Sequence, residues 1–260
     1  MANIKEEKVN IDGLDVNYKI AGREGPAVLI LHGWGGSSDS WLNVQKELAS
    51  SGYKVINPDL PGFGKSSPPL EAWSINDYSD LVFKFSDALG LTKFFLLGHS
   101  FGGRISIRFS KLHSERIEKL ILCGSAGIKG RRDIKSLMIY SAARIGNAIF
   151  TPKLFLRFKE GVRSFFYSFI RNRDYVKARG IMRETMIRVL EEDLLPDLDF
   201  IHLKTLLVWG EKDKMVPLRF AEVFKEKIGG SELRVLPKVG HSPHLECPQE
   251  LTSIIKDFFK

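Results

Sequence analysis

The sequence has little cysteine: its 260 residues include two, Cys123 and Cys247, which lie far apart in the chain. They form neither a close pair nor a metal-ligand spacing, so we expect reduced thiols in a cytoplasmic protein rather than a disulfide framework. No pair or cluster of cysteine and histidine has the spacing of a metal site. We therefore expect no metal and no bound cofactor.

Long apolar runs are also absent. Runs such as residues 94–97 and 205–209 are far too short to cross a bilayer, and the polar segment 1–8 does not resemble a secretory signal. Hydrophobic residues make up 43% and charged residues 27% of the chain, which excludes wholesale disorder. A chain of this length can bury a full hydrophobic core as one domain, with or without an insertion.

What the sequence does contain is a regular alternation of two patterns. Short continuous apolar runs, typical of strands buried on both faces, alternate with helical stretches of about ten to fifteen residues. The predicted strands are at 27–31, 54–57, 94–97, 120–123, 205–209 and 233–236, and the predicted helices at 40–50, 75–89, 101–112, 218–228 and 249–259. A hairpin around a turn at Asp12 and Gly13 precedes them. The pattern predicts an α/β fold with a mostly parallel, doubly wound sheet.

The alternation breaks between about 127 and 200, where no strand pattern occurs and three apolar stripes have helical spacing. The stripes are Met138, Ala142, Ile145 and Ile149; Phe155, Phe158, Val162, Phe165 and Phe169; and Ala178, Met182, Met186 and Val189. We expect a core formed by residues 1–126 and 199–260, with a helical insertion at 127–198 between two core strands.

A Gly-x-Ser-x-Gly motif at residues 98–102 lies between a predicted strand and a predicted helix. Such a junction needs a tight turn that lifts the Ser100 hydroxyl above the sheet, and the following helix adds its N-terminal dipole at the same place. A serine hydroxyl is a poor nucleophile unless a base takes its proton. Ser100 is therefore the predicted nucleophile, and a base is required near it.

His241 is the predicted base among the six histidines, because it follows the last strand at the sheet edge where Ser100 should lie. Asp213 follows the preceding strand and is the predicted carboxylate that orients His241. His244 competes with His241 for the role of base, and Glu211 competes with Asp213 for that of the acid. The chain order of nucleophile, acid and base is the order found on this architecture.

Two backbone amides should form the oxyanion hole. One is the amide of Phe101, directly after the nucleophile, and the other lies in the glycine-rich turn 32–36, where we choose Trp34. His32 is expected to organise this turn through hydrogen bonds. His99 is expected to point into helix packing and to have a structural role rather than carry a proton.

These motifs together resemble the α/β-hydrolase fold superfamily, specifically its small capped members. The resemblance rests on residues 32–36, 59–66 and 98–103 and on the pair Asp213 and His241, which span nearly the whole chain outside the insertion. It implies that the insertion forms a helical cap over the site and that 59–66 is a tight structural loop. Haloalkane dehalogenases and most epoxide hydrolases of this family have an aspartate at the nucleophile position, so the serine here argues against both.

From this resemblance we expect a carboxylesterase that cleaves a small or medium ester with an apolar part through an acyl-enzyme intermediate. A carbon–carbon bond hydrolase of ring-cleavage dienoates is an alternative because it uses the same three side chains. Transfer of the acyl group to an acceptor other than water is another. A ligand receptor without turnover also stays open, and the sequence gives no indication of the oligomeric state.

The net charge of +8 is unevenly distributed along the chain. Residues 128–190 contain fifteen Lys or Arg and four acidic residues, whereas the remainder has 24 basic and 27 acidic residues. A solvated outer face of the insertion explains this charge, and so does attraction of the basic, phenylalanine-rich segment to anionic lipid or to an anionic substrate. No nucleic-acid motif accompanies the charge, so we expect no nucleic-acid partner.

Overall fold

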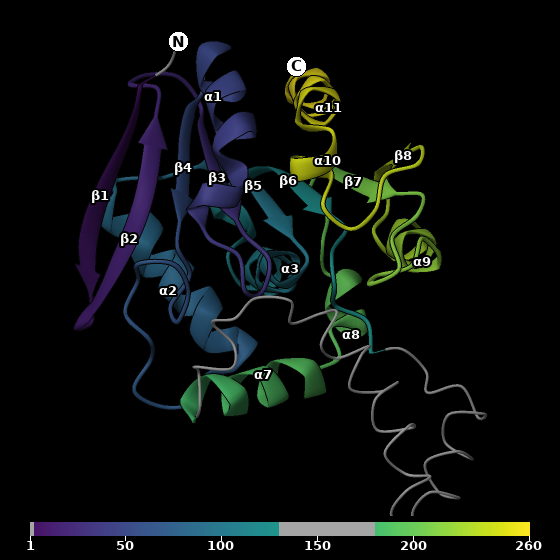
Figure 1. Ribbon diagram of the computed structural model, residues 1–260. Helices are drawn as coiled ribbons and strands as arrows, with labels where there is room; N and C mark the ends of the chain where they lie inside the picture. Colours follow the sequence, from purple (N-terminus) through teal and green to yellow (C-terminus); the bar gives the residue numbers. More distant parts are fainter. Residues whose placement is uncertain (1–2, 130–179) are drawn as a thin grey trace, which may run out of the picture.

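The computed structural model describes residues 3–129 and 180–260, and within these ranges the strands form one eight-stranded sheet (Figure 1). Its strands are β1 (Ile4–Ile11), β2 (Leu14–Ala21), β3 (Ala27–Leu31), β4 (Lys54–Pro58), β5 (Phe94–His99), β6 (Ile117–Cys123), β7 (Thr205–Gly210) and β8 (Glu232–Leu236). Their spatial order is β1-β2-β4-β3-β5-β6-β7-β8. The β1–β2 and β2–β4 pairs are antiparallel and all the others are parallel, which confirms the prediction of a mostly parallel sheet.

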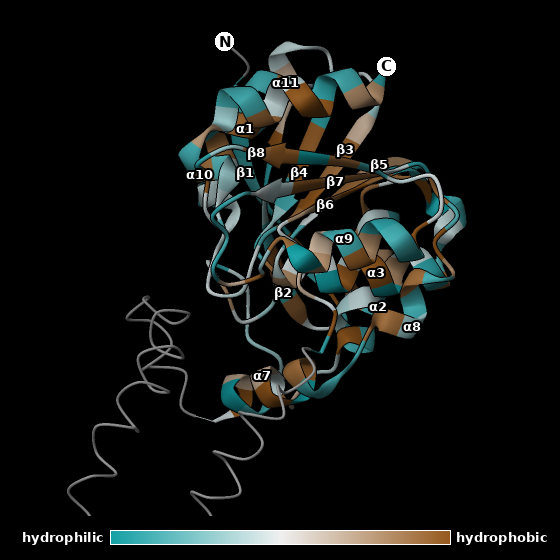
Figure 2. Cartoon of the chain, turned by 90° about the vertical axis from the view of Figure 1, so that its right-hand side faces the viewer, coloured by the Kyte–Doolittle hydropathy of each residue, from teal (hydrophilic) through white to brown (hydrophobic). Residues whose placement is uncertain are grey.

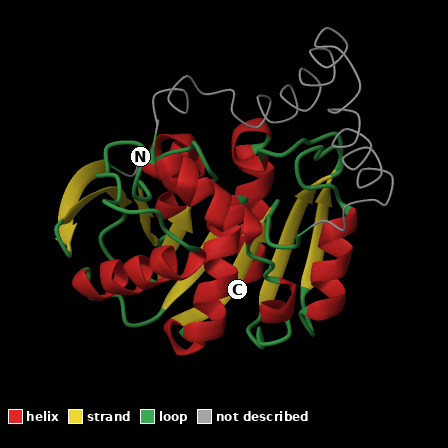
Figure 3. Cartoon of the chain, turned by 90° about the horizontal axis from the view of Figure 1, so that it is seen from below, coloured by secondary structure: helices red, strands yellow, loops and turns green. Residues whose placement is uncertain are grey.

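Helices cover both faces of this sheet. They are η1 (Ser38–Trp41), α1 (Leu42–Ser50), α2 (Ile75–Ala88), α3 (Phe101–Leu112), η2 (Ser114–Arg116), α7 (Ile181–Glu191), α8 (Leu195–Leu198), α9 (Arg219–Lys227), α10 (Pro243–Glu246) and α11 (Pro248–Phe259). The apolar residues of α1 and α11 pack in one core, and those of α2, α3 and α9 pack in the other. The sheet is therefore doubly wound, and its strands splay across the view from below in Figure 3.

The central strands are apolar throughout because each one contributes to both cores. Along β3, Val28 and Ile30 pack with α1 and α11, whereas Leu29 and Leu31 point to the opposite core. Successive side chains of a strand point to opposite faces, so a strand between two helical layers needs an unbroken apolar run. Figure 2 shows these central strands in the brown of hydrophobic residues.

The local signals in the sequence fix the ends of several elements. Asp12 and Gly13, both with positive φ, make the turn between β1 and β2. Ser74 accepts a hydrogen bond from the amide of Asp77, whose carboxylate accepts one from the amide of Ser74, and this capping box starts α2. The predicted strands and helices of the core end within about two residues of the observed ones, except that β6 begins three residues before the predicted strand 120–123.

Of the predicted insertion 127–198, the structure describes residues 127–129 and 180–198. In the second part, α7 carries the stripe Met182, Met186 and Val189 as buried residues. The other two stripes and Ala178 lie outside the described residues. The guanidinium of Arg104 on α3 donates to the carbonyl oxygen of Val189 at 2.6 Å and to that of Glu192, so it holds the C-terminal end of α7. The end of the insertion is thereby attached to α3, the helix that begins after Ser100.

A second set of polar contacts fixes the segment that returns to the core. Asp197 accepts from Arg108 and from Lys111, both at 2.7 Å, and the Asp197 side chain is nearly buried. The two cations lie one turn and two turns after Arg104 on the same face of α3.

Among the helices of residues 3–129 and 180–260, none has the length and apolar character needed to cross a membrane.

Candidate active site

Ser100 lies at a sharp turn between β5 and α3. Its φ of 52° and ψ of −108° are unusual for a residue that is not glycine, and the turn holds its backbone by hydrogen bonds to both sides. The Ser100 amide donates to the carbonyl oxygen of Cys123 at 3.2 Å, and its own carbonyl oxygen accepts from the amides of Arg104 and Ala126, both at 3.2 Å. This is the strained strand-to-helix geometry that the Gly-x-Ser-x-Gly motif predicts.

The two glycines of the motif allow the turn to pack tightly. A Cβ atom on Gly102 would lie 2.1 Å from the carbonyl oxygen of Leu31 in β3, and one on Gly98 would lie 2.3 Å from the Oγ of Ser106. Neither space admits a side chain, so only glycine lets α3 begin this close to the sheet. The close approach brings the start of α3 against the loop after β3.

Asp213 and His241 form a hydrogen-bonded pair, with Asp213 Oδ2 and His241 Nδ1 2.7 Å apart. The other oxygen of Asp213 accepts from the amides of Met215 and Val216, both at 2.8 Å, which fixes the carboxylate in the turn after β7. Because the carboxylate accepts, Nδ1 of His241 carries the hydrogen and Nε2 presents a lone pair. The imidazole therefore has the tautomer that a general base needs.

The end of β6 connects this pair with the serine. Cys123 accepts the Ser100 amide, and a Cβ atom on the next residue, Gly124, would lie 3.4 Å from Asp213 Oδ2 and 3.5 Å from His241 Nδ1. The three side chains predicted for catalysis thus gather around the carboxyl ends of β5, β6 and β7, where open α/β sheets place their sites.

The predicted oxyanion donors lie on either side of the turn. The carbonyl oxygen of His32 accepts the amide of Gly102 at 3.1 Å, and a Cβ atom on Gly33 would lie 3.4 Å from the Cβ of Ser100. Neither the Trp34 amide nor the Phe101 amide donates to an acceptor within the described part of the chain. Both are therefore available to a substrate oxygen, as a helix start and a glycine-rich loop allow.

The two competing side chains have other partners. His244 stacks on Trp41 with ring centroids 4.3 Å apart, and burial lowers its pKa to about 3. Glu211 accepts the backbone amide of Lys238 at 2.9 Å. Within residues 3–129 and 180–260, no group of three His, Cys, Asp or Glu side chains is arranged to hold a metal ion.

His32 organises the turn before Trp34, as the sequence predicts. Its Nε2 accepts the amide of Leu60 at 2.9 Å, so Nδ1 carries the hydrogen and donates to the carbonyl oxygen of Gly33 at 2.8 Å. Burial lowers the pKa of His32, which keeps the ring neutral in this role. His99 packs against Trp41 at the end of η1 and against His244 on α10, in line with the expected structural role, and its ring also lies beside that of His241.

The sequence analysis missed Asp59 as the centre of the tight loop 59–66. Its carboxylate accepts the amides of Ser38 at 2.6 Å and Lys65 at 2.9 Å, and the side chain of Asn17 at 2.9 Å. Burial alone would raise the pKa of Asp59, but these hydrogen bonds hold it below its ordinary value. A buried acid directly after a strand is a weak signal in a sequence, because its partners Asn17, Ser38 and Lys65 come from three separate segments.

An aromatic cluster next to Ser100 was also missed. Trp34 packs edge-on against Phe63 and Phe101, with ring centroids 4.9 and 5.0 Å apart, and Tyr78 packs on Phe101 at 5.0 Å. Trp34 and Phe63 are only partly buried. These rings form an apolar wall beside the two amides. Trp34 and Phe63 lie in loops and Phe101 begins a helix, so among the four only Tyr78, on the buried stripe of α2, belongs to a periodic pattern.

Comparison with known proteins gives relatives of two kinds. A 2-hydroxy-6-oxononadienedioate/2-hydroxy-6-oxononatrienedioate hydrolase of Pseudomonas putida is 28% identical over 94% of this chain and 92% of its own. The acetyltransferase component of the acetoin cleaving system of the same organism is 27% identical, and the chain spans only 66% of its length. Among solved structures, a bacterial membrane phospholipase A has a TM-score of 0.77 and 25% identity, with 98% of this chain and 86% of that one covered. A serine hydrolase involved in carbazole degradation has a TM-score of 0.76 and 26% identity over 99% of both chains.

The family assignment follows from the sequence match and the fold together. The family model described as "alpha/beta hydrolase fold" matches residues 26–162, more than half of the chain. The matched range contains the turn before Trp34 and the turn at Ser100. The chain therefore belongs to the alpha/beta hydrolase fold family and is a hydrolase.

Proposed function

We propose that the protein is a serine hydrolase that cleaves a small or medium carboxylic ester with an apolar part. The observation that carries the proposal is the Asp213–His241 hydrogen bond of 2.7 Å beside the strained turn that presents Ser100. A serine on such a turn, a histidine with a free Nε2 lone pair and a buried carboxylate are the parts of a nucleophilic acyl transfer site.

In the proposed reaction, Ser100 Oγ attacks the ester carbonyl carbon while His241 Nε2 takes the hydroxyl proton. The tetrahedral intermediate collapses, the alcohol leaves with the proton from His241, and an acyl-Ser100 ester remains. Water then repeats the sequence, with its proton passing through His241 to Ser100 as the acid is released. Asp213 stays ionised and favours the imidazolium that forms in both halves.

Two further features support the ester substrate. The amides of Trp34 and Phe101, which have no acceptor within residues 3–129 and 180–260, suit the negative oxygen of the tetrahedral intermediate. Each such donor contributes roughly 3 kcal/mol to transition-state stabilisation. The partly buried rings of Trp34 and Phe63 offer apolar area to an acyl or alcohol group. The membrane phospholipase A of similar structure is a relative in line with this substrate class.

Hydrolysis of p-nitrophenyl acetate and butyrate tests the proposal. Wild type should release p-nitrophenol, and Ser100→Ala should lower kcat by about four orders of magnitude or more, because no other group replaces the nucleophile. Ser253→Ala, at an exposed position of α11, is the matched control and should leave the rate unchanged. Equal rates for wild type and Ser100→Ala would end the proposal.

A carbon–carbon bond hydrolase is the second candidate, favoured by the dienedioate hydrolases at 28% identity over nearly the full chain. The same serine, histidine and aspartate would act on a ketone instead of an ester. Turnover of a 2-hydroxy-6-oxo dienoate without turnover of the two esters would establish this reaction in place of ester hydrolysis. The acetyltransferase relative adds a third arm to the panel, in which an alcohol is offered as acyl acceptor in place of water.

A further inference from the structure

His99 is the last residue of β5 and directly precedes Ser100, and its ring is almost completely buried. Its Nε2 lies 2.8 Å from the carbonyl oxygen of His241. A carbonyl oxygen can only accept, so Nε2 carries the hydrogen and donates it. The strand that ends directly before the predicted nucleophile thus holds the backbone of the predicted base through one hydrogen bond.

The Nδ1–Cε1 edge of the same ring faces the glycine-rich turn 32–36, which we call the oxyanion loop. A Cβ atom on Gly33 would lie 2.9 Å from Nδ1 and 3.2 Å from Cε1 of His99, so the ring is in close contact with the residue before Trp34. Within the described part of the chain, Nδ1 has no hydrogen-bond partner. Its position against Gly33 is therefore set by packing rather than by a polar contact.

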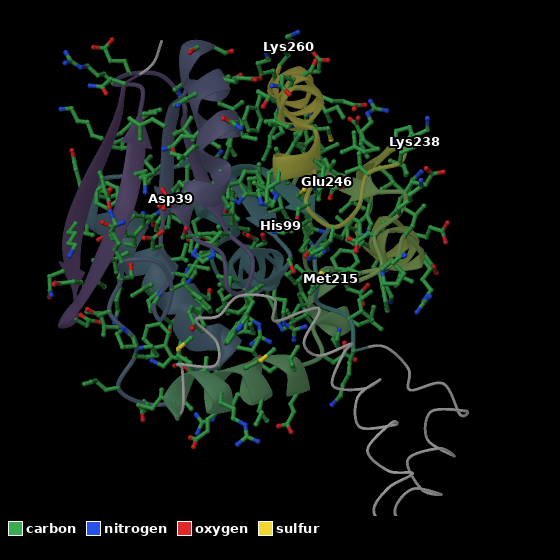
Figure 4. All side chains as sticks on the ribbon, viewed as in Figure 1. Asp39, His99, Met215, Lys238, Glu246 and Lys260 are labelled. Atoms are coloured by element: carbon green, nitrogen blue, oxygen red, sulfur yellow. The ribbon has the colours of Figure 1, made fainter. Side chains whose placement is uncertain are left out.

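The surroundings of His99 keep the ring neutral and fixed. Burial lowers the pKa of His99 well below its ordinary value, and the neighbouring His244 and His241 lower it further. The rings of Trp41, His241 and His244 lie 6.1, 4.9 and 4.6 Å from it between centroids. Figure 4 shows His99 in the interior of the molecule, whereas Lys238 and Lys260 lie at its periphery. Burial disfavours the protonated ring, and the Nε2 hydrogen is already donated to a carbonyl oxygen, so this enclosed imidazole is suited to a geometric role rather than to proton transfer.

The loop that carries His241 has a second support of a different origin. The carboxylate of Glu246 accepts the amide of Gly240 at 2.7 Å and that of Ser242 at 3.0 Å. Glu246 lies on α10, four residues after Ser242. Its contacts therefore fix the shape of the loop but do not fix the position of the loop relative to β5. Among residues 3–129 and 180–260, the bond from His99 is the only hydrogen bond between β5 and this loop.

We propose that His99 is a positioning residue. It sets the distances between the turn at Ser100, the loop that carries His241 and the oxyanion loop. This inference rests on the proposed function, because it assigns a role in the reaction of Ser100 and His241. A shift of about 1 Å in such a constellation costs roughly a hundredfold in rate. Loss of the Nε2 donor should therefore lower kcat. KM should stay nearly unchanged, because the apolar wall beside the two amides keeps its position.

Three substitutions separate the hydrogen bond from the packing. In His99→Gln the amide nitrogen reaches the position of Nε2 and keeps the donor, whereas in His99→Asn it reaches only the position of Nδ1. His99→Phe keeps the ring volume without any donor. With p-nitrophenyl butyrate, we expect kcat to fall about tenfold to a hundredfold in the Asn and Phe variants and no more than about threefold in the Gln variant.

The unfolding midpoint of each variant and the inactive Ser100→Ala protein are measured alongside. Equal activity of wild type and His99→Asn would overturn the inference. So would a fall in activity that follows the loss of stability in all three variants, whether or not the donor is kept. If His99→Phe does not fold, the Gln and Asn variants alone decide the outcome. Full activity of Ser100→Ala would instead overturn the proposed function, and the two failures are therefore distinct.

Discussion

The contact between Asp213 and His241 can be tested with a single atom exchange. In Asp213→Asn, the side-chain oxygen can still accept the amides of Met215 and Val216, but the NH₂ group faces His241 Nδ1. The imidazole then carries its hydrogen on Nε2 and cannot take the proton of Ser100. We expect kcat for p-nitrophenyl butyrate to fall about ten-thousandfold, the size of this effect in the serine protease triad.

The matched control for this exchange is Glu211→Gln, two residues away in the same turn. Glu211 contacts the amide of Lys238 and not the imidazole, so its exchange should change kcat less than about twofold. Both proteins should unfold at nearly the same temperature as wild type. If Asp213→Asn keeps a tenth of the wild-type activity, Asp213 is not the residue that orients His241.

The buried His244 predicts how stability depends on pH. Its pKa is about 3 in the folded protein against an ordinary value of 6.5, mainly because of burial. Between these two pH values the unfolded chain binds a proton that the folded protein does not, so the free energy of unfolding falls as pH falls. The slope for one such histidine approaches about 1.4 kcal/mol per pH unit.

Urea unfolding at several pH values between about 7 and 4.5 measures this slope. His244→Phe keeps an aromatic ring against Trp41 and removes the titrating group, so its slope should be smaller by about one proton. His202→Phe, at an exposed position, is the control and should leave the slope unchanged. Parallel pH profiles for wild type and His244→Phe would show that this histidine is protonated to the same extent in both states.

At the scale of elements, the sequence predicts what local patterns determine. The apolar runs of the central strands and the stripe on α7 place these elements, because burial on one or two faces leaves a period in the sequence. The motif around Ser100 places the turn of the site because its residues are contiguous in the sequence. His241 and Asp213 follow from the rule that parallel strands end at one edge.

Contacts between distant segments leave no such period. Arg104 resembles any cation on an amphipathic helix, yet it is buried and holds the carbonyl oxygens of Val189 and Glu192. Its partners are backbone atoms, which have no residue type to find in the sequence. The hydrogen bonds of Asp59 and the bond from His99 to the carbonyl oxygen of His241 could not be predicted for the same reason, since these partners include backbone groups on other loops.

The hydrogen bonds from Arg104 attach α7 to α3, so their removal should lower the free energy of unfolding strongly. Arg104→Met keeps much of the buried volume but removes the donors to both carbonyl oxygens, and buried acceptors without partners cost about 1 to 3 kcal/mol each. We expect the free energy of unfolding in urea to fall by about 3 kcal/mol. Lys93→Met breaks an ion pair with Glu118 in which both side chains are about half exposed, and should change it by less than about 0.5 kcal/mol. Equal values for the two variants would contradict an anchoring role for Arg104.

At the scale of the whole molecule, the charge divides the chain into two parts. Residues 128–190 carry an excess of eleven positive charges, and the rest of the chain has an excess of three negative charges. A net charge spread over the surface mainly affects solubility, whereas a concentrated one creates a local potential. The interpretation as a solvated face and the interpretation as a lipid-attracting segment therefore differ in a measurable way.

We propose that this basic segment draws the protein to anionic membranes. Each Lys or Arg near an anionic surface contributes about 1 kcal/mol, and the attraction falls within a Debye length of about 8 Å at physiological salt. Co-sedimentation with liposomes should therefore rise with the fraction of phosphatidylserine and fall as salt increases. Exchange of Lys153, Arg157, Lys159 and Arg163 for Gln should weaken sedimentation. A fourfold exchange of Lys5, Lys8, Lys46 and Lys84, outside the segment, should have a much smaller effect. Sedimentation that depends on neither lipid charge nor salt would leave the charge as a solvated surface.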